Sequence, residues 1–438
     1  MTSEDYRKGS LSLAGTVAMG TGVMIGAGIF ALTGQVAGLA GAWFPLAFVL
    51  AGLVSGLSAY SYIKVSSAYP SAGGIAMILS KAYGRTAVAA TASMIMAFSM
   101  VINESLVART FGTYVVQLLD VDDAFWVPVL AVGLILAAFG VNVAGNKAIG
   151  AVSKVAAVLK VGGILAFAVV TLWVAGFDFQ PVPSGGAIDA SVSGLLAGTA
   201  LAVLAYKGFT TITNSGSEVV DPGRNIGRAI VISLAVCAVV YLAVAVAVGS
   251  ALTIPEIVQA RDYSLAEAAR PALGGTGVVF TVVIAIIATA SGLLASTFAV
   301  SRMLAMLTDM KLIPHRHFGM PGRVQQHTLV YTVVVAAVMA ALFDLSRIAA
   351  VGAILYLVMD MAIHWGVLRH LRNEVGARPG VLIAAIVADT IILGAFVAIR
   401  ARQDPFIVVL ATAMIVAVFA FEAFYLGAHR RESDAHEQ

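Results

Sequence analysis

Apolar residues follow one another along most of the chain, and polar residues gather in short stretches between long apolar segments. A segment of about 20 apolar residues can cross the hydrocarbon core of a bilayer as a helix. The pattern predicts an all-α polytopic membrane protein with twelve transmembrane helices. These lie at approximately residues 11–37, 42–63, 86–118, 126–142, 150–176, 192–216, 228–252, 274–307, 328–343, 347–368, 380–399 and 406–428.

The connections between these segments are short, so we expect one transmembrane domain over residues 1–438. The connection 64–85 contains a proline and two adjacent glycines but stays partly apolar, and we expect it to fold back against the cytoplasmic face. The connection 253–273 is typical of short amphipathic helices at the surface.

The composition supports a membrane location. Of the 438 residues, 60% are hydrophobic and only 11% are charged, and the mean hydropathy is +0.96. The core of a soluble domain does not need so many apolar side chains. The N-terminal sequence MTSEDYRKGS lacks a cleavage-site pattern, so we predict that the first apolar segment is a retained helix. Cys237 is the only cysteine, which excludes an intramolecular disulfide and a cysteine metal cluster.

Lysines and arginines fall mainly in alternate connections. With the N-terminus placed in the cytoplasm, the outer side receives only Arg261, Arg270, Arg347, Arg400 and Arg402. Cytoplasmic loops carry such an excess of basic residues. We therefore predict a multi-pass protein of the cell (plasma) membrane with both termini cytoplasmic. The net charge of +3 follows from this topology and gives no reason to expect a nucleic-acid partner.

The first apolar segment contains the sequence GTGVMIGAGIF, from Gly20 to Phe30. Its four glycines disfavour a continuous helix, because each costs about 1 kcal/mol relative to alanine in a helix interior. A broken helix inside a membrane is tolerated where the freed backbone groups face protein or a water-filled cavity, so the pattern indicates a binding site. The alternative is close helix packing through small residues such as Gly22 and Gly26.

The sixth apolar segment contains a second interruption, at Gly208 in the sequence AYKGF, followed by a run of threonine, asparagine and serine residues. Interrupted helices in the two halves of a chain are typical of secondary transporters. The turn Asp221 to Arg224 then stops the helix. Glu218 and Arg224 would lie at the cytoplasmic face, either as a salt-bridge gate or as ordinary surface charge.

Two lysines are predicted to lie too deep in the membrane to reach water. Lys160 is eleven residues into the helix that starts at Gly150, about 15 Å deep. Such a lysine must pair, face a cavity or lose its proton; the alternative to a functional role is a structural lysine neutralised by a carboxylate. Lys207 needs a counter-charge as well, and Glu104 in the third segment lies nearest its depth, with Arg109 as a competitor for Glu104.

The tenth segment carries Asp360 and His364 one helical turn apart, either as a proton relay or as a satisfied structural pair. The last two segments, which contain Asp389 and Glu422, are expected to be peripheral. We find no metal cluster and no nucleophile–base pair of the kind a membrane enzyme needs, so neither enzymatic activity nor a cofactor is expected.

These motifs together resemble the amino acid–polyamine–organocation superfamily of secondary transporters. The first helix of that superfamily carries a G-[ST]-G-I-F break, and this chain has GAGIF at Gly26 to Phe30. The sixth carries an [FA]-x-G-F break followed by E-x-x-N-P-x-R, matched by AYKGF and by EVVDPGR from Glu218. The eighth ends S-R-x-x-x-A-M…L-P, matched in part by Ser301, Arg302, Met306 and Pro314.

The resemblance implies a five-plus-five inverted repeat with helices one and six broken. The repeats would cover about residues 11–176 and 192–368, with two extra helices over about 380–428. It also implies that an amino acid or amine binds at the breaks, with its carboxylate at the backbone amides and its ammonium at the carbonyls. The implied substrate-binding residues are Met24, Ile25, Gly26, Ala27, Gly28, Leu204, Ala205, Lys207 and Phe209, with Phe209 as an aromatic lid.

The resemblance further places Lys160 on the lysine that proton-coupled members carry in helix five, where it takes the role of a sodium ion. Its implied neighbours are the carbonyls of Gly22 and Ile25 and the side chain of Thr297. The chain departs from the superfamily pattern at Ala27, which replaces a hydroxyl residue, and at Lys207, which stands where an apolar residue is usual.

We therefore predict a proton-coupled, sodium-independent importer, an amino acid symporter working on a small amino acid by alternating access. Its partners would be this substrate, the proton and the lipid bilayer. One alternative is an amino acid or amine exchanger on the same fold. Another is a non-transporting receptor or scaffold, against which the two broken helices argue because they cost stability without an evident structural benefit.

Overall fold

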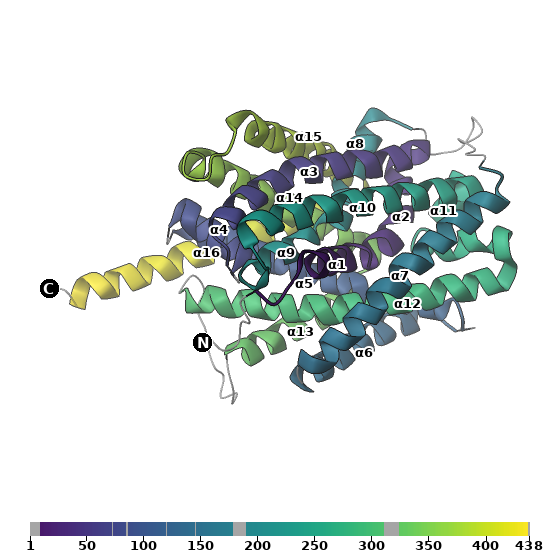
Figure 1. Ribbon diagram of the computed structural model, residues 1–438, viewed down its shortest axis with the longest axis horizontal. Helices are drawn as coiled ribbons and strands as arrows, with labels where there is room; N and C mark the ends of the chain where they lie inside the picture. Colours follow the sequence, from purple (N-terminus) through teal and green to yellow (C-terminus); the bar gives the residue numbers. More distant parts are fainter. Residues whose placement is uncertain are drawn as a thin grey trace.

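The computed structural model describes residues 9–436 except Ala72, Arg85, Asp120, Gly145, 178–189 and 311–323. The described residues form helices and turns, with one isolated bridge between Leu11 and Val219 (Figure 1). The helices in chain order are α1 (Leu13–Met24), α2 (Ala27–Ala40), η1 (Gly41–Trp43), α3 (Phe44–Ala68), α4 (Gly74–Tyr83), α5 (Ala87–Val116), α6 (Asp123–Ala144), α7 (Asn146–Val174), α8 (Val192–Tyr206), α9 (Phe209–Asn214), η2 (Gly216–Glu218), α10 (Pro222–Ala251), α11 (Ile254–Gln259), α12 (Ser264–Asp309), α13 (Val324–Leu342), α14 (Leu345–Gly366), η3 (Val367–Leu371), α15 (Pro379–Gln403) and α16 (Pro405–His436).

The twelve apolar segments predicted from the sequence all coincide with helix in the described residues. Ten helical stretches there are long and apolar enough to cross a membrane. One of them, Gly28–Ala68, runs through parts of the first two segments. The shorter apolar helices Leu13–Met24 and Gln326–Leu342 cover the rest of the first segment and the ninth. The all-α polytopic fold is thus confirmed, and the number twelve stays a prediction.

Local sequence explains where several helices begin. Ser12, Thr86, Ser191 and Asp344 each accept a hydrogen bond from the backbone N–H three residues later, which satisfies one of the free donors at a helix start. α12 consists of two helices that meet at Gly274, where φ is +60°. Glycine adopts this left-handed conformation without strain, so the second part begins where the eighth apolar segment was predicted.

The helices sort into an inner and an outer group. α5, α8 and α14 are mostly buried, whereas α6, α7, α15 and α16 expose most of their apolar surface, as lipid-facing helices do. Asp389 on α15 and Glu422 on α16 are nevertheless fully buried. The last two predicted segments are thus peripheral as helices, but their two carboxylates lie on faces turned toward the bundle.

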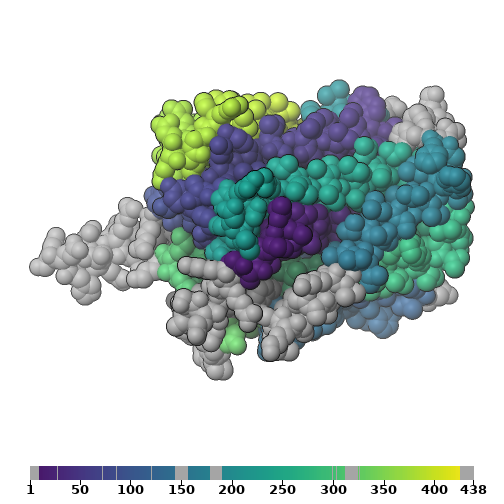
Figure 2. All heavy atoms as spheres, viewed as in Figure 1, coloured from purple at the N-terminus to yellow at the C-terminus, as the bar shows by residue number. Residues whose placement is uncertain are grey.

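The connection after α3 folds back onto the bundle as α4, which buries Ile75, Ile78 and Leu79 and contacts α5, α9 and α14. In the space-filling view, α1 (purple) lies at one face of the molecule between α10 and α7 (Figure 2). The break after α1 therefore leads from this face into the centre of the bundle, where α2 packs against α8.

Candidate substrate and coupling site

The first predicted break is present. α1 ends at Met24, and α2 begins at Ala27. Between them, Ile25 and Gly26 have non-helical backbone angles. The last carbonyls of α1 and the first amides of α2 lack partners within their own helices. An α-helix concentrates partial positive charge at its N-terminus and partial negative charge at its C-terminus. The break therefore offers amides for an anion and carbonyls for a cation within a few residues of each other.

The second break is tighter than the sequence suggested. α8 ends at Tyr206, and Lys207 and Gly208 keep backbone angles close to those of a helix. The amides of Thr210 and Thr211 donate to the carbonyls of Lys207 and Gly208 at 3.0 and 3.1 Å, three residues back instead of four. The interruption is thus a short 3₁₀ turn, which frees fewer backbone groups than an unwound segment.

Two glycines allow the break after α1 and the break after α8 to pack directly against each other. A Cβ atom on Gly28 would lie 2.8 Å from Cα of Ala205, and one on Gly208 would lie 2.8 Å from the backbone nitrogen of Met24. Real Cβ atoms do not approach other atoms so closely. α2 therefore packs on the end of α8, and the turn after α8 packs on the end of α1, only because both positions lack side chains.

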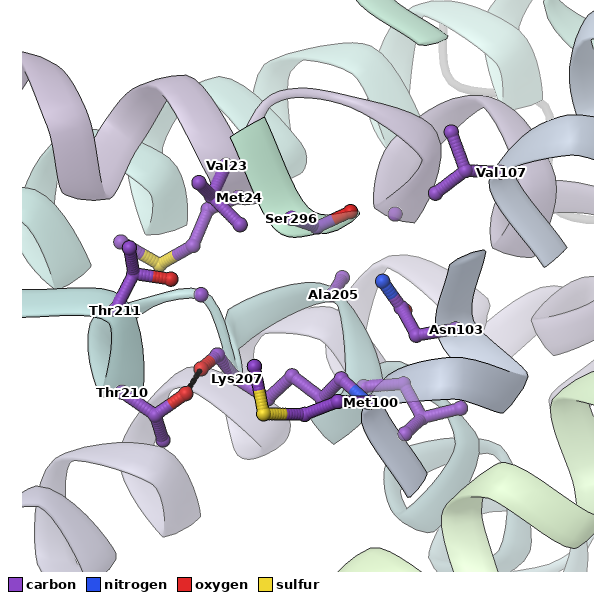
Figure 3. Close-up of a pocket in the computed structure, with 13 residues that line it drawn as sticks. Val23, Met24, Met100, Asn103, Val107, Ala205, Lys207, Thr210, Thr211 and Ser296 are labelled. Atoms are coloured by element: carbon purple, nitrogen blue, oxygen red, sulfur yellow. Dashed lines mark hydrogen bonds between the residues drawn. The ribbon is translucent and has the colours of Figure 1, made fainter. Parts of the chain in front are cut away.

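A cavity of about 40 Å³ lies where the breaks meet. Its lining combines apolar side chains and glycines with a few polar groups from α5, α8, α9 and α12: Val23, Met24, Gly28, Met100, Asn103, Val107, Leu204, Ala205, Lys207, Gly208, Thr210, Thr211 and Ser296. Figure 3 shows Asn103 and Ser296 reaching toward each other from α5 and α12, while Met24 of α1 points toward Thr211. A small cavity with few, converging polar groups suits a small polar ligand.

The cavity brings together Met24, Gly28, Leu204, Ala205 and Lys207 of the predicted substrate-binding residues. The others stand apart from its lining. Ile25 and Gly26 are buried in the break itself, and Ala27 begins α2. Phe209 packs edge-to-face on Tyr62, with ring centroids 5.2 Å apart, so its role as a lid stays a prediction.

Lys160 is buried, and its ammonium group donates to the carbonyl of Gly22, as the resemblance implied. Its second contact is the hydroxyl of Ser291 at 3.5 Å. The implied contact with Thr297 is not made, because Thr297 lies with Ser296 against the carboxylate of Glu104 instead. The contact between Lys160 and Gly22 ties α7 to the last turn of α1.

Lys207 does not form a direct ion pair with Glu104. Its ammonium group donates instead to the backbone carbonyl of Ser99 at 2.9 Å and lies 3.4 Å from the Ser99 hydroxyl. Arg109 does not pair with Glu104 either, because its guanidinium donates to the carbonyl of Ala340 at 2.9 Å. Lys207 and Glu104 are both buried, and their opposite charges still interact through space.

The family model described as amino acid permease matches residues 11–426. The chain belongs to the amino acid permease family. The permease is 28% identical over 392 residues to the inner membrane transport protein YbaT of Escherichia coli K12, covering 88% of this chain and 89% of that protein.

Two further relatives extend the comparison. The uncharacterized protein MJ0609 of Methanocaldococcus jannaschii is 28% identical over 430 residues, which cover 96% of each chain. The uncharacterized transporter Rv1999c of Mycobacterium tuberculosis H37Rv is 31% identical over 352 residues, which cover 77% of this chain and 74% of that protein. The family and these relatives make the permease a membrane transport protein.

Tyr241 of α10 is a residue of the site that our sequence reasoning missed. Its hydroxyl lies 2.5 Å from the carbonyl of Met24 and 3.0 Å from that of Ala205, so it bridges the two breaks of the permease. Both carbonyls were predicted to bind a substrate ammonium group. The available signal was the position of a tyrosine deep in an apolar segment, since a buried tyrosine hydroxyl needs a partner.

The predicted gate residues lie where the N-terminal segment of the permease meets the chain after α9. Leu11 exchanges backbone hydrogen bonds with Glu218 and Val220, both at 2.9 Å. Arg224 is exposed in the first turn of α10. The bridge ties the start of α1 to the end of the second break, while the gating role of Glu218 and Arg224 stays a prediction.

Proposed function

We propose that this permease imports a small neutral or acidic amino acid together with a proton, without sodium, by alternating access. The observation that carries the proposal is the junction of the two breaks: a small cavity with free helix ends, beside a buried lysine that holds α1. Helix ends at the centre of a membrane bundle are the substrate and ion sites of secondary transporters. The orientation of the charges favours cytoplasmic termini.

The cavity chemistry supports a zwitterion. The amides at the start of α2, including those of Ala27 and Gly28, suit a carboxylate, and the carbonyls at the ends of α1 and α8 suit an ammonium group. Among the residues that the structure describes, Lys207 is the one charged residue in the lining, and no carboxylate lines the cavity. The volume and this charge both disfavour arginine and polyamines.

Tyr241 suggests how the site responds to substrate. Its hydroxyl lies on the carbonyls of Met24 and Ala205, which are the acceptors a substrate ammonium group needs. Substrate binding then replaces this hydroxyl at one or both carbonyls, and the contact between α1 and α8 changes from a side-chain bridge to a substrate bridge. A ligand shifts a conformational equilibrium through such a difference in contacts.

Lys160 supports proton coupling. With its proton it donates to the Gly22 carbonyl and holds α1 against α7; without it, the lysine donates fewer hydrogen bonds and the hold weakens. Proton occupancy thereby biases the position of the broken helix, which is what a coupling ion must do.

A ligand screen tests the proposal. Purified permease is heated in the presence of each amino acid and of polyamines at two pH values, and stabilisation of the folded state marks the ligands. Ligands are then followed as radiolabelled substrates into proteoliposomes. We expect stabilisation and net uptake with small neutral or acidic amino acids. Uptake that requires an amino acid inside the vesicles would instead identify an exchanger, and selective stabilisation by polyamines would refute the substrate class.

A further inference from the structure

A second cluster of ionisable side chains lies outside the cavity. Asp360 and His364 are one turn apart on α14, and Asp389 lies on α15, which packs against both α14 and α3 (Figure 1). All three side chains are at most 1% exposed. None lines the cavity, and the transport mechanism proposed above does not use them.

The three residues point their donor atoms at one another. Nε2 of His364 lies 3.6 Å from Oδ2 of Asp360 and 3.5 Å from Oδ2 of Asp389, and the three donor atoms lie within 4.8 Å of one another. A charge-assisted hydrogen bond between a histidine and a carboxylate would be about 2.7–2.9 Å long. These separations instead match the edge of a four-coordinate site, which is about 3.4 Å for ligands 2.1 Å from a metal.

The surrounding hydroxyl groups hold two of these residues in place. Ser58 and Tyr62 of α3 donate to the two carboxylate oxygens of Asp360, each at 2.6 Å. The Ser61 hydroxyl lies 2.7 Å from Nδ1 of His364. When Nδ1 carries the proton and donates to Ser61, the lone pair of Nε2 faces the two carboxylates, as in metal-binding histidines oriented by an outer partner. These bonds have ordinary lengths, so the wider spacing at Nε2 is specific to that position.

Asp389 provides an independent indication of a ligand. Within the described residues, neither of its carboxylate oxygens has a hydrogen-bond partner, and neither has Nε2 of His364. No lysine or arginine of the described residues forms an ion pair with Asp360 or Asp389. A buried carboxylate without compensation is costly, so positive charge is needed beside these carboxylates. A second proton on His364 would supply it, but the separations of 3.5 and 3.6 Å at Nε2 are longer than a charge-assisted hydrogen bond, which favours an ion held between the three donors.

We infer that Asp360, His364 and Asp389 bind one divalent transition-metal ion of the zinc, iron or manganese class. A neutral histidine and two carboxylates exactly balance a charge of +2, and one nitrogen with oxygen ligands suits these metals. Calcium requires six to eight oxygen ligands, which three side chains do not supply. The ion clamps α14 to α15, beside Tyr62, whose ring packs on Phe209 at the second break.

Metal analysis of the purified protein tests this inference independently of transport. The full chain is purified without chelators, incubated with zinc or cobalt, freed of loose metal and analysed for metal per chain. Visible absorption then reports the coordination of bound cobalt. The variants are Asp389→Asn and His364→Gln. Glu422→Gln is the matched control, because it removes another buried carboxylate whose oxygens have no hydrogen-bond partner in the described residues.

We expect about one metal ion per chain in the wild type and in Glu422→Gln, and at least about a tenfold weaker affinity in Asp389→Asn and His364→Gln. We also expect bound cobalt to give a visible absorption spectrum that Asp389→Asn and His364→Gln change. A wild type that purifies without metal and takes up neither zinc nor cobalt would overturn the inference, as would variants that bind like the wild type. If the variants do not fold, the metal content and the cobalt spectrum of the wild type decide.

Discussion

At the scale of single residues, Tyr241 decides how the two breaks are held together. Tyr241→Phe removes the hydroxyl that bridges the carbonyls of Met24 and Ala205. We expect the free energy of unfolding without substrate to fall by about 1–3 kcal/mol, because buried carbonyls lose their donor. Stabilisation by substrate should then increase, since an ammonium group no longer competes with the hydroxyl. Thermal unfolding with and without substrate measures both effects.

Tyr206→Phe is the matched control for this variant. Tyr206 packs on Tyr241 with ring centroids 4.9 Å apart, but its hydroxyl donates to the carbonyl of Phe48 at 3.0 Å, away from the breaks. It should lower stability without changing the response to substrate. Equal responses in the two variants would show that Tyr241 is only a structural residue.

Lys207 determines substrate charge in this proposal. It is the charged residue of the described cavity lining, and its ammonium group donates a hydrogen bond to the backbone carbonyl of Ser99. We expect Lys207→Met to weaken binding of acidic amino acids by about tenfold, because one charge interaction in a partly dry site is worth about 1.4 kcal/mol or more. Neutral amino acids should be affected less. Competition against a radiolabelled neutral substrate measures the difference, and a wild type that binds polyamines tightly, with Lys207→Met unchanged, would contradict the assignment.

Sequence reasoning found the residues of the site that break a pattern. Glycines in an apolar helix and lysines at mid-depth stand out, and the contact between Lys160 and Gly22 followed from the family resemblance. Tyr241 was missed because it fits its apolar helix by composition, and Asp389 was noted only as part of a peripheral segment. Their significance depends on neighbours far away in the chain, which no single helix reveals.

At the scale of elements, the contact between α2 and α8 depends on Gly28. Gly28→Ala places a Cβ atom 2.8 Å from Cα of Ala205 and must push the helices apart. We expect uptake to fall by about tenfold or more, because small displacements of binding groups have large effects on rate. Folding should persist at a cost of about 1–3 kcal/mol.

Gly56→Ala serves as the control for this substitution, because a Cβ atom at Gly56 on α3 meets nothing within 4 Å. Uptake in proteoliposomes and gel filtration of the purified variants separate lost function from lost folding. Normal substrate binding by a folded Gly28→Ala would remove the start of α2 from the site.

The segment between α11 and α12 gives a pH-dependent contact with α2. Gln35 donates to the carboxylate of Asp262 at 2.5 Å. Burial raises the pKa of Asp262 above its ordinary value of about 3.9, despite the opposing effect of Arg261. The folded protein then binds this proton more tightly than the unfolded chain, so ionisation lowers stability as the pH rises above about 4.

Asp262→Asn keeps an acceptor for Gln35 and cannot ionise. We expect it to raise the Tm near neutral pH and to have a smaller effect at about pH 4, because the wild-type carboxyl binds more protons there. Thermal unfolding across this range measures the difference. A lower Tm at neutral pH would mean that the interactions of Asp262 with Arg261 and Arg109 outweigh its burial.

The helices themselves were predictable because membrane-spanning segments must be long and apolar. The positions of the two breaks were predictable, since Gly26 and Gly208 lie where the helices are interrupted. The tight 3₁₀ geometry at Gly208 was not, because the turn packs closely against Met24, which is far away in the chain. The kink at Gly274 falls where the eighth apolar segment was predicted to begin, after Pro271.

At the scale of the whole molecule, the permease is a bundle whose inner helices carry the breaks and whose outer helices face lipid. α1 lies between α10 and α7. The Lys160 contact holds its C-terminal turn, and the bridge at Leu11 holds the segment just before its N-terminus. In the proposed mechanism, a change in the protonation of Lys160 acts on α1 as a whole. This would link a single side chain to alternating access.

The central claim is that the proton on Lys160 couples the pH gradient to transport. Gradient-driven uptake in proteoliposomes tests this claim most directly. We predict that acid outside drives accumulation of substrate, that acid inside slows it and that sodium has no effect. Lys160→Ala should lose accumulation and retain exchange of internal for external substrate, which shows that the variant still folds and binds. Sodium-dependent uptake by the wild type, or full pH-driven accumulation by Lys160→Ala, would contradict this account.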